Sequence, residues 1–371
     1  MAKKSSNHSS FVKRILALDG GGIRGIFSLQ ILAKIEEFFR QESKEENLVL
    51  ANVFDLIAGT STGAIIATFL SWGKSVREIE RLYVERGAEM FAREHWHRRW
   101  KAKYRADAIA QFFREILVEE DRTPALLGSK LLRTLLLVVV RNASTGSAWP
   151  LWNNPNAKYS DPTRPNCNLN IPLWQLVRAS TAAPYYFPPE DVKLGDKQFL
   201  FVDGGLTPFN NPALIAILMA TLPAYCLCWP ATRDALHVIS VGTGAARARL
   251  PQKMASKINM VDQIKYLAPA LLESIAVEQD ILCRVLGDCM YGAKVDSELG
   301  TLDAPSLFGQ SEQKFTYVRY DEPFNLTPSE ARELVRGRTQ MDNLKAIPDL
   351  QKAGEQYAKK HVRPEHLVPR R

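Results

Sequence analysis

The sequence predicts an α/β fold in which a mostly parallel central sheet is covered by helices on both faces. Short apolar runs at residues 12–18, 53–58, 135–140, 199–202 and 236–241 are predicted strands. The run at 135–140 reads Leu-Leu-Leu-Val-Val-Val, which is typical of a strand covered on both faces. Segments with helical periodicity lie between these runs, and strands that alternate with helices indicate a parallel-type sheet.

The remaining segments extend this plan. Helices are predicted at residues 26–39, 64–72, 172–180 and 260–286, and a capping box of Ser75 and Glu78 begins another. Residues 142–172 predict a long irregular connection, residues 314–320 an edge strand, and residues 327–330 a helix start. The expected organisation is a disordered tail at 1–10, one domain at 11–325 and a helical extension at 326–371.

Composition and charge narrow the class of protein. Of the 371 residues, 46% are hydrophobic and 24% charged, which is an ordinary globular balance. The net charge of +8 favours anionic partners such as nucleotides or acidic lipids. The polar N-terminus lacks the apolar region of a signal peptide, and five scattered cysteines indicate a reducing compartment. We therefore expect a cytoplasmic protein.

Residues 213–231 carry no charge and raise the question of a membrane span. A span needs about 20 mostly apolar residues, and Pro223 in the middle of this stretch weakens it further. A buried helix that continues into a loop is the preferred interpretation. Cys226 and Cys228 lie in this apolar stretch without a nearby histidine, so we expect both in the core rather than at a metal.

Ser61 is the first candidate catalytic residue. It lies in the pattern Gly59-Thr-Ser61-Thr-Gly63, between an apolar strand and an apolar helix, as a nucleophile elbow requires. The glycines allow a sharp turn that leaves the serine accessible, and the following helix directs its positive end toward the reacting centre.

A second glycine loop, Asp19-Gly20-Gly21-Gly22-Ile-Arg24-Gly25, also follows a strand and begins a helix. The same spacing occurs in dinucleotide-binding loops, but Asp19 would place a carboxylate near the pyrophosphate, and residues 41–47 offer no acid at a strand end for a ribose. The geometry equally suits an oxyanion hole, in which closely spaced amides stabilise negative charge. Arg24 either adds positive charge or anchors the loop.

A serine nucleophile needs a base, and two residues compete for this role. Among six histidines, only His237 lies at a predicted strand position, and the order Ser61, Asp203, His237 matches an α/β-hydrolase triad. Catalytic histidines of that fold lie on loops, however, so a structural strand histidine is the better interpretation. Asp203 lies where a strand ends at Gly204 and Gly205, and in a shielded site it can accept the serine proton.

The three motifs together resemble patatin-like phospholipases, in order and in context. The segment Ala-Ser-Thr-Ala-Ala-Pro at residues 179–184 is also similar to the family, and the resemblance covers about residues 11–325. It implies a patatin-like three-layer fold and a Ser61–Asp203 dyad without histidine. It also implies an oxyanion hole formed or supported by Gly20, Gly21, Gly22 and Arg24.

The implied activity is hydrolysis of fatty-acyl esters of phospholipids through an acyl-enzyme, with no metal or organic cofactor. Some bacterial enzymes of this type are effectors of anti-phage defence that a cyclic dinucleotide activates, which adds such a nucleotide as a candidate partner. We expect contact with the inner face of the membrane and no nucleic acid polymer as a partner; the sequence does not indicate an oligomeric state.

Residues 93–105 interleave tryptophan and tyrosine with cations, a pattern that fits a lipid interface, a nucleotide or a solvated helix face. Two rival functions stay open at this point. One is a Ser61–Asp203–His237 esterase that acts on small soluble esters. The other is a nucleotide-binding module without catalysis.

Overall fold

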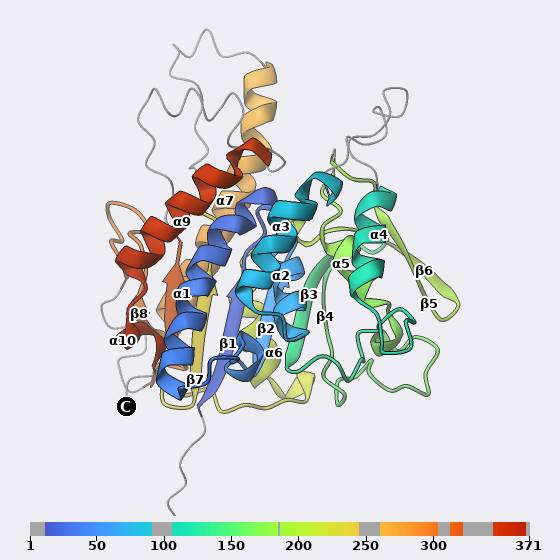
Figure 1. The fold of residues 1–371 in the computed structure, drawn as a ribbon, viewed down its shortest axis with the longest axis horizontal. Helices are drawn as coiled ribbons and strands as arrows, with labels where there is room; N and C mark the ends of the chain where they lie inside the picture. Colours follow the sequence, from blue (N-terminus) through green and yellow to red (C-terminus); the bar gives the residue numbers. More distant parts are fainter. Residues whose placement is uncertain are drawn as a thin grey trace, which may run out of the picture.

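A nine-stranded sheet forms the centre of the computed structural model, with the order β5-β6-β3-β2-β1-β7-β9-β8 and with β4 paired to β3 (Figure 1). The structure describes residues 12–90, 106–184, 186–244, 260–302, 312–321 and 344–368. The strands are β1 (Lys13–Leu18), β2 (Leu56–Thr60), β3 (Leu135–Asn142), β4 (Ser147–Trp152), β5 (Glu190–Leu194), β6 (Lys197–Asp203), β7 (Leu236–Val241), β8 (Asp288–Tyr291) and β9 (Thr316–Tyr320). The pairings from β3 through β8 are parallel, whereas β4 and β6 run antiparallel to β3.

Helices cover both faces of this sheet, as predicted. They are α1 (Gly25–Ser43), α2 (Thr62–Ser71), α3 (Val76–Met90), α4 (Ala106–Ile116), α5 (Leu173–Ser180), α6 (Ala213–Thr221), α7 (Met260–Leu286), α9 (Ile347–His361) and α10 (Pro364–Leu367). In β1, Leu16 and Leu18 pack toward the face covered by α1 and α2, while Ile15 and Ala17 pack toward α6. Because side chains of a strand alternate between faces, a strand buried on both sides is apolar throughout.

Two predictions about the sheet need correction. The connection at 142–172 contains β4, which forms a hairpin with β3. The segment at 314–320 is not an edge strand, because β9 lies between β7 and β8 and is buried along its whole length. Its polar residues are satisfied inside the protein: Thr316 bonds to His237, and Arg319 bonds to Asp19. The polar residues that alternate with apolar ones in β9 therefore face partners inside the protein and not solvent.

The uncharged stretch 213–231 forms the short helix α6 and then a turn, so the preferred interpretation is confirmed. No helix in the described part of the chain is both long and apolar enough to span a bilayer. The expectation for the two thiols is wrong, since Cys226 and Cys228 are exposed, with φ angles of 62° and 52°. Pro223 follows the end of α6 and begins a short 3-10 turn, and the chain beyond it runs along the surface.

The C-terminal helix α9 lies along α1 on one face of the sheet (Figure 1). The rings of Tyr357 and Phe27 are 5.5 Å apart, and Gly354 packs against Gln30. The capping box at the start of α3 is present, with bonds between the Ser75 amide and the Glu78 carboxylate. The tail at 1–10, the basic and aromatic stretch at 93–105 and the helix start at 327–330 lie outside the described residues. The domain boundary at 325 stays a prediction.

Candidate active site

The sheet brings the Ser61 turn and the distant acid Asp203 to the same level at one end of the strands. Strands β2 and β3 are parallel, with Thr60 opposite Val139, so Ser61 follows at the level of Val140. Strand β6 runs antiparallel to β3 and ends with Asp203 opposite Val140. The register therefore places Ser61 and Asp203 on either side of β3.

Ser61 lies in a strained turn between β2 and α2. Its φ of 55° and ψ of −121° are unusual for a residue with a side chain. The turn is tightly packed: a β-carbon at Gly63 would collide with the Leu18 carbonyl oxygen, and one at Gly59 would collide with the backbone of Gly63. Only glycine fits at both positions, which explains the spacing of the motif and gives Ser61 the geometry of a nucleophile elbow.

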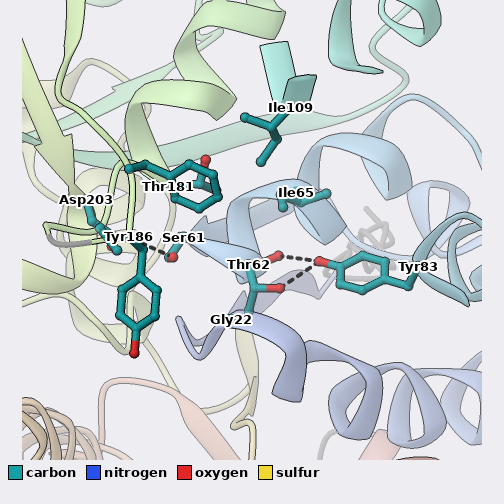
Figure 2. Close-up of a pocket in the computed structure, with 11 residues that line it drawn as sticks. Gly22, Ser61, Thr62, Ile65, Tyr83, Ile109, Thr181, Tyr186 and Asp203 are labelled. Carbon is teal, nitrogen blue, oxygen red and sulfur yellow. Dashed lines mark hydrogen bonds between the residues drawn. The ribbon is translucent and has the colours of Figure 1, made fainter. Parts of the chain in front are cut away.

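The side chains of Ser61 and Asp203 meet directly (Figure 2). The Ser61 hydroxyl donates to Oδ2 of Asp203 at 2.7 Å, and the Gly205 amide donates to Oδ1 at 2.7 Å. A β-carbon at Gly204 would collide with the Val139 carbonyl oxygen, so the turn after Asp203 is pressed against β3. Both oxygens of the carboxylate are thus fixed, one by the backbone of its own loop and one by the serine.

The carboxyl group of Asp203 is more basic than usual. Asp203 is only 6% exposed, and burial raises the pKa of its carboxyl group to about 6. The Gly205 amide, the Ser61 hydroxyl and the charge of Arg178 lower this pKa by smaller amounts. Burial disfavours the charged form because an apolar surrounding solvates a carboxylate poorly. At neutral pH the group is an anion that accepts a proton more readily than an exposed aspartate.

The other glycine loop lies beside Ser61, as its predicted role requires. Gly20 packs against the β-carbon of Ser61, and Gly22, with a φ of 60°, lines the cavity at Ser61. The Gly20 amide, however, donates to the Asn210 carbonyl oxygen at 3.1 Å and is not available to an oxyanion. Gly25 packs against Thr62, so the loop and the start of α2 are fitted to each other.

A cavity of about 480 Å³, including its open mouth, lies next to Ser61 and Asp203 (Figure 2). Apart from the residues already named, it is lined mainly by apolar and aromatic side chains: Ile65, Tyr83, Ile109, Ala183, Tyr186 and Phe187. The Tyr83 hydroxyl is turned away from open space and shares a hydrogen bond of 2.6 Å with the hydroxyl of Thr62. The pocket therefore combines one reactive pair with an apolar wall.

Comparison with known proteins decides the family. The family model for patatin-like phospholipases matches residues 16–217, which include both glycine loops, Ser61 and Asp203. The chain belongs to the patatin-like phospholipase family.

Individual relatives agree with this result. The cGAMP-activated phospholipase of Escherichia coli (strain TW11681) is 32% identical over 212 residues, which cover 55% of each chain. Patatin-like protein 4 of Arabidopsis thaliana is 30% identical over 254 residues, or 63% of this chain and 60% of that protein. The 85/88 kDa calcium-independent phospholipase A2 of Rattus norvegicus is 29% identical over 222 residues, which cover 58% of this chain and 24% of that protein. The matches to the first two relatives span little more than half of the length of each of those proteins.

A buried ion pair from beyond the matched region holds the glycine loop of this patatin-like chain. Arg319 on β9 donates to both carboxylate oxygens of Asp19, at 2.8 and 2.6 Å, and also to Asp321 at 2.8 Å. No local pattern in the sequence predicts this contact of Arg319, because 300 residues separate it from Asp19. Asp19 therefore anchors the loop, which is a further reason not to interpret the loop as a dinucleotide site.

Arg24 lies in the glycine loop, close to Tyr186. Its charge interacts with Asp321 and Tyr186, and burial lowers the pKa of its guanidinium. Its Nε is buried and has no hydrogen-bond partner among the described residues. Arg24 thus carries positive charge close to Tyr186, which lines the cavity, and direct anchoring of the loop by its Nε is absent from the described structure.

His237 lies far from this patatin-like site. It is opposite Arg14 in the register of β7 and β1, whereas Leu18 is opposite Gly59 in β2. Ser61 is therefore about six residues further along the sheet than His237, or roughly 20 Å at 3.3 Å per residue. The ring is fully buried, bonds to the Thr316 hydroxyl at 2.6 Å and has its pKa lowered to about 3 by burial. The triad alternative is wrong, and His237 is a strand histidine.

The described residues contain no group of three His, Cys, Asp or Glu side chains arranged to hold a metal ion. The Ser61 hydroxyl is bonded to one carboxylate, that of Asp203, and the glycine loop packs beside it. Such an arrangement supports proton transfer and stabilisation of an oxyanion at a carbonyl carbon.

Proposed function

We propose that this protein is a serine acyl hydrolase that cleaves fatty-acyl esters of membrane phospholipids with a dyad of Ser61 and Asp203. The observation that carries the proposal is the 2.7 Å bond between the Ser61 hydroxyl and the buried Asp203 carboxylate at the side of an apolar cavity. Membership of the patatin-like phospholipase family supports the substrate class.

In the first step, Oγ of Ser61 attacks the ester carbonyl carbon while its proton moves to Oδ2 of Asp203. The resulting carboxylic acid then gives the proton to the leaving alcohol as the ester bond breaks, which produces an acyl-serine. In the second step a water molecule gives a proton to Asp203 and its oxygen attacks the carbonyl carbon of the acyl-serine. Asp203 then returns this proton to Oγ of Ser61 as the bond between Oγ and the acyl carbon breaks, so that a fatty acid leaves and both residues are regenerated. A pKa of about 6 suits a base that works near neutral pH.

The oxyanion is stabilised by the glycine loop. Because the Gly20 amide is bonded to Asn210, we assign the donor role to the amides of Gly21 and Gly22, with Gly22 at the cavity. Arg24 adds positive charge from beside this loop. A single such donor contributes on the order of 3 kcal/mol to stabilisation of the transition state.

The apolar wall of the cavity binds the acyl chain. Ile65 and Ile109 lie on the side of Ser61 away from Tyr186 (Figure 2), and Phe187 adds an aromatic surface. Each methylene group that moves from water to such a wall contributes about 0.8 kcal/mol. The arrangement thus favours a long acyl ester over a small soluble one.

The decisive experiment measures release of fatty acid from vesicles of phosphatidylethanolamine and phosphatidylglycerol by the wild type and by Ser61→Ala. Ser71→Ala is a matched control, since Ser71 is buried on α2 and its hydroxyl has no partner among the described residues. We expect hydrolysis by the wild type and the control only, and covalent labelling of Ser61 by a fluorophosphonate. Persistent hydrolysis by Ser61→Ala contradicts the proposal, and a protein that binds nucleotides but is never labelled is the non-catalytic module instead.

We further propose that a cyclic dinucleotide activates the enzyme at the cytoplasmic face of the membrane, in defence against phage. Two bacterial relatives, from Escherichia coli and from Vibrio cholerae, at 32% and 31% identity, are named cGAMP-activated phospholipases. The test is the vesicle assay with and without added cGAMP, together with sedimentation of the protein with vesicles. Equal rates at all nucleotide concentrations would remove activation from the proposal and leave the hydrolase assignment intact.

A further inference from the structure

The C-terminal turn of α5 bonds to the backbone of both members of the proposed dyad. The Ser61 amide donates to the hydroxyl of Ser180 at 2.9 Å, and the Asp203 amide donates to the Ala182 carbonyl oxygen at 3.1 Å. Ser180 and Ala182 are separated by a single residue, so one short segment contacts two loops that are 142 residues apart in the chain.

The hydroxyl of Ser180 is buried and makes two hydrogen bonds, which leave it little freedom to rearrange. It donates to the Val139 carbonyl oxygen at 2.7 Å while it accepts from the Ser61 amide, and the residue is 0% exposed. A serine hydroxyl has one donor and two acceptor positions, so the bond to Val139 uses its only proton and the bond from the Ser61 amide uses one acceptor position. Removal of the oxygen would leave the Ser61 amide without this acceptor and the Val139 carbonyl without this donor.

The bond between the Ser61 amide and the Ser180 hydroxyl stabilises the backbone at the strained active-site turn. With a φ of 55° and a ψ of −121°, Ser61 adopts a backbone conformation that persists only when the surrounding structure holds it. The carbonyl side of Ser61 is held by α2, because the amides of Ala64 and Ile65 donate to it. The amide side is held by Ser180.

The same contact relates the serine to the acid. The Val139 carbonyl that accepts from Ser180 is also the group against which Gly204, next to Asp203, is pressed. Ser180 therefore lies where the Ser61 turn, β3 and the Asp203 loop come together. It also takes the Ser61 amide out of the set of donors available to an oxyanion.

We propose that Ser180 is a positioning residue that fixes the backbone of Ser61 at hydrogen-bonding distance from Asp203, an inference that rests on the proposed function. Ser180 contacts no reacting atom; it acts through the Ser61 amide. The orientation of the Ser61 hydroxyl toward both Asp203 and the cavity depends on this bond (Figure 2 shows the pair that it aligns).

The test compares Ser180→Ala and Ser180→Cys with Ser71→Ala, the control that removes a buried hydroxyl without a described partner. We expect Ser180→Ala to lower kcat and the rate of fluorophosphonate labelling by about 10- to 100-fold, since a small displacement of a reacting group has effects of this size. KM and the pH midpoint of the acid limb should stay unchanged, because substrate contacts and Asp203 are intact. Ser180→Cys, with a thiol that bonds weakly, should give an intermediate loss.

Each outcome separates this inference from the proposed function. If wild type and Ser71→Ala are active and both Ser180 variants match them, the positioning role is wrong while the hydrolase assignment stands. If the wild type is neither active nor labelled, the proposed function itself fails. A parallel loss in kcat and in melting temperature for Ser180→Ala and Ser71→Ala alike would show a general packing effect and overturn the inference. Should Ser180→Ala not fold, Ser180→Cys carries the same comparison.

Discussion

Two buried carboxylates near the same edge of the sheet, Asp203 and Asp19, have similar surroundings and different partners. They are 6% and 5% exposed, and burial raises the pKa of each to about 6. Asp19 is bound at both oxygens by the Arg319 guanidinium, whereas Asp203 is bound by a backbone amide and by the hydroxyl of Ser61.

This difference separates an anchor from a base. Asp19 is a neutralised anion whose charge is matched by a fixed cation, so protonation or removal breaks a buried pair. The charge of Arg178 lowers the pKa of Asp203 slightly, but its guanidinium donates to the Pro188 carbonyl and not to the carboxylate. The Asp203 carboxylate therefore accepts from the hydroxyl of Ser61, a group that can transfer its proton, and not from a fixed cation.

The largest expected effect is loss of activity on Asp203→Asn. The amide cannot accept the Ser61 proton, so we expect kcat to fall by about 10²- to 10⁴-fold, the range for loss of a general base. Measurement of fatty-acid release by Asp203→Asn and Asp19→Asn under the same conditions checks the comparison. Equal losses in the two variants, at equal stability, would remove the distinction between base and anchor.

Breaking the anchor should mainly affect stability. Arg319→Met leaves Asp19 and Asp321 buried without their cation, and loss of one partner of a buried pair costs about 3–5 kcal/mol of unfolding free energy. Urea denaturation of Arg319→Met, of Asp19→Asn and of the double variant measures this cost. The double variant should lose less than the sum of the single ones, and strict additivity would contradict a direct pair.

Variants of the two acids should both change how the stability of the folded state depends on pH. A carboxyl whose folded pKa is about 6, above its ordinary value of 3.8, makes the folded state bind protons more tightly, so wild-type stability falls as pH rises through this interval. Asp203→Asn removes one such group and should be more stable than wild type above pH 6, by at most about 3 kcal/mol. The gain should shrink toward pH 4. Asp19 has a folded pKa of about 6 as well, so Asp19→Asn should weaken the pH dependence of stability in the same direction, while the loss of a carboxylate partner for Arg319 lowers stability at every pH. Urea denaturation at pH 4 and at pH 7 separates the two effects.

The smallest expected effect is the decrease of kcat/KM at acid pH. Because Asp203 must be ionised to accept a proton, kcat/KM should fall about tenfold for each pH unit below the folded pKa of about 6. A pH profile on a soluble acyl ester gives this midpoint directly. Asp19→Asn should leave the midpoint within a few tenths of a unit if Asp19 is only an anchor, and a large displacement would mean that Asp19 also titrates with the reaction.

Several features of the protein follow from local sequence. A strand, a tight glycine-flanked turn and a helix around Ser61 depend on neighbouring residues, and the structure has them where they were predicted. The same is true of the helix at 260–286, whose bounds agree with the prediction, and of the second glycine loop after β1. The interpretation of His237 as a strand histidine also rests on its apolar neighbours, and the register of β7 confirms it.

Only the tertiary structure decided how these pieces meet. The direction of β6, which ends with Asp203 level with Ser61 across β3, depends on strand pairing between segments far apart in the chain. The Arg319 anchor and the Ser180 bond have the same origin, and so does the burial of β9, whose polar residues find partners inside the protein. Local sequence favours a turn at these residues, but the strained conformation of Ser61 and the distances between turns are set by the packing of the whole sheet, which no single segment of sequence contains.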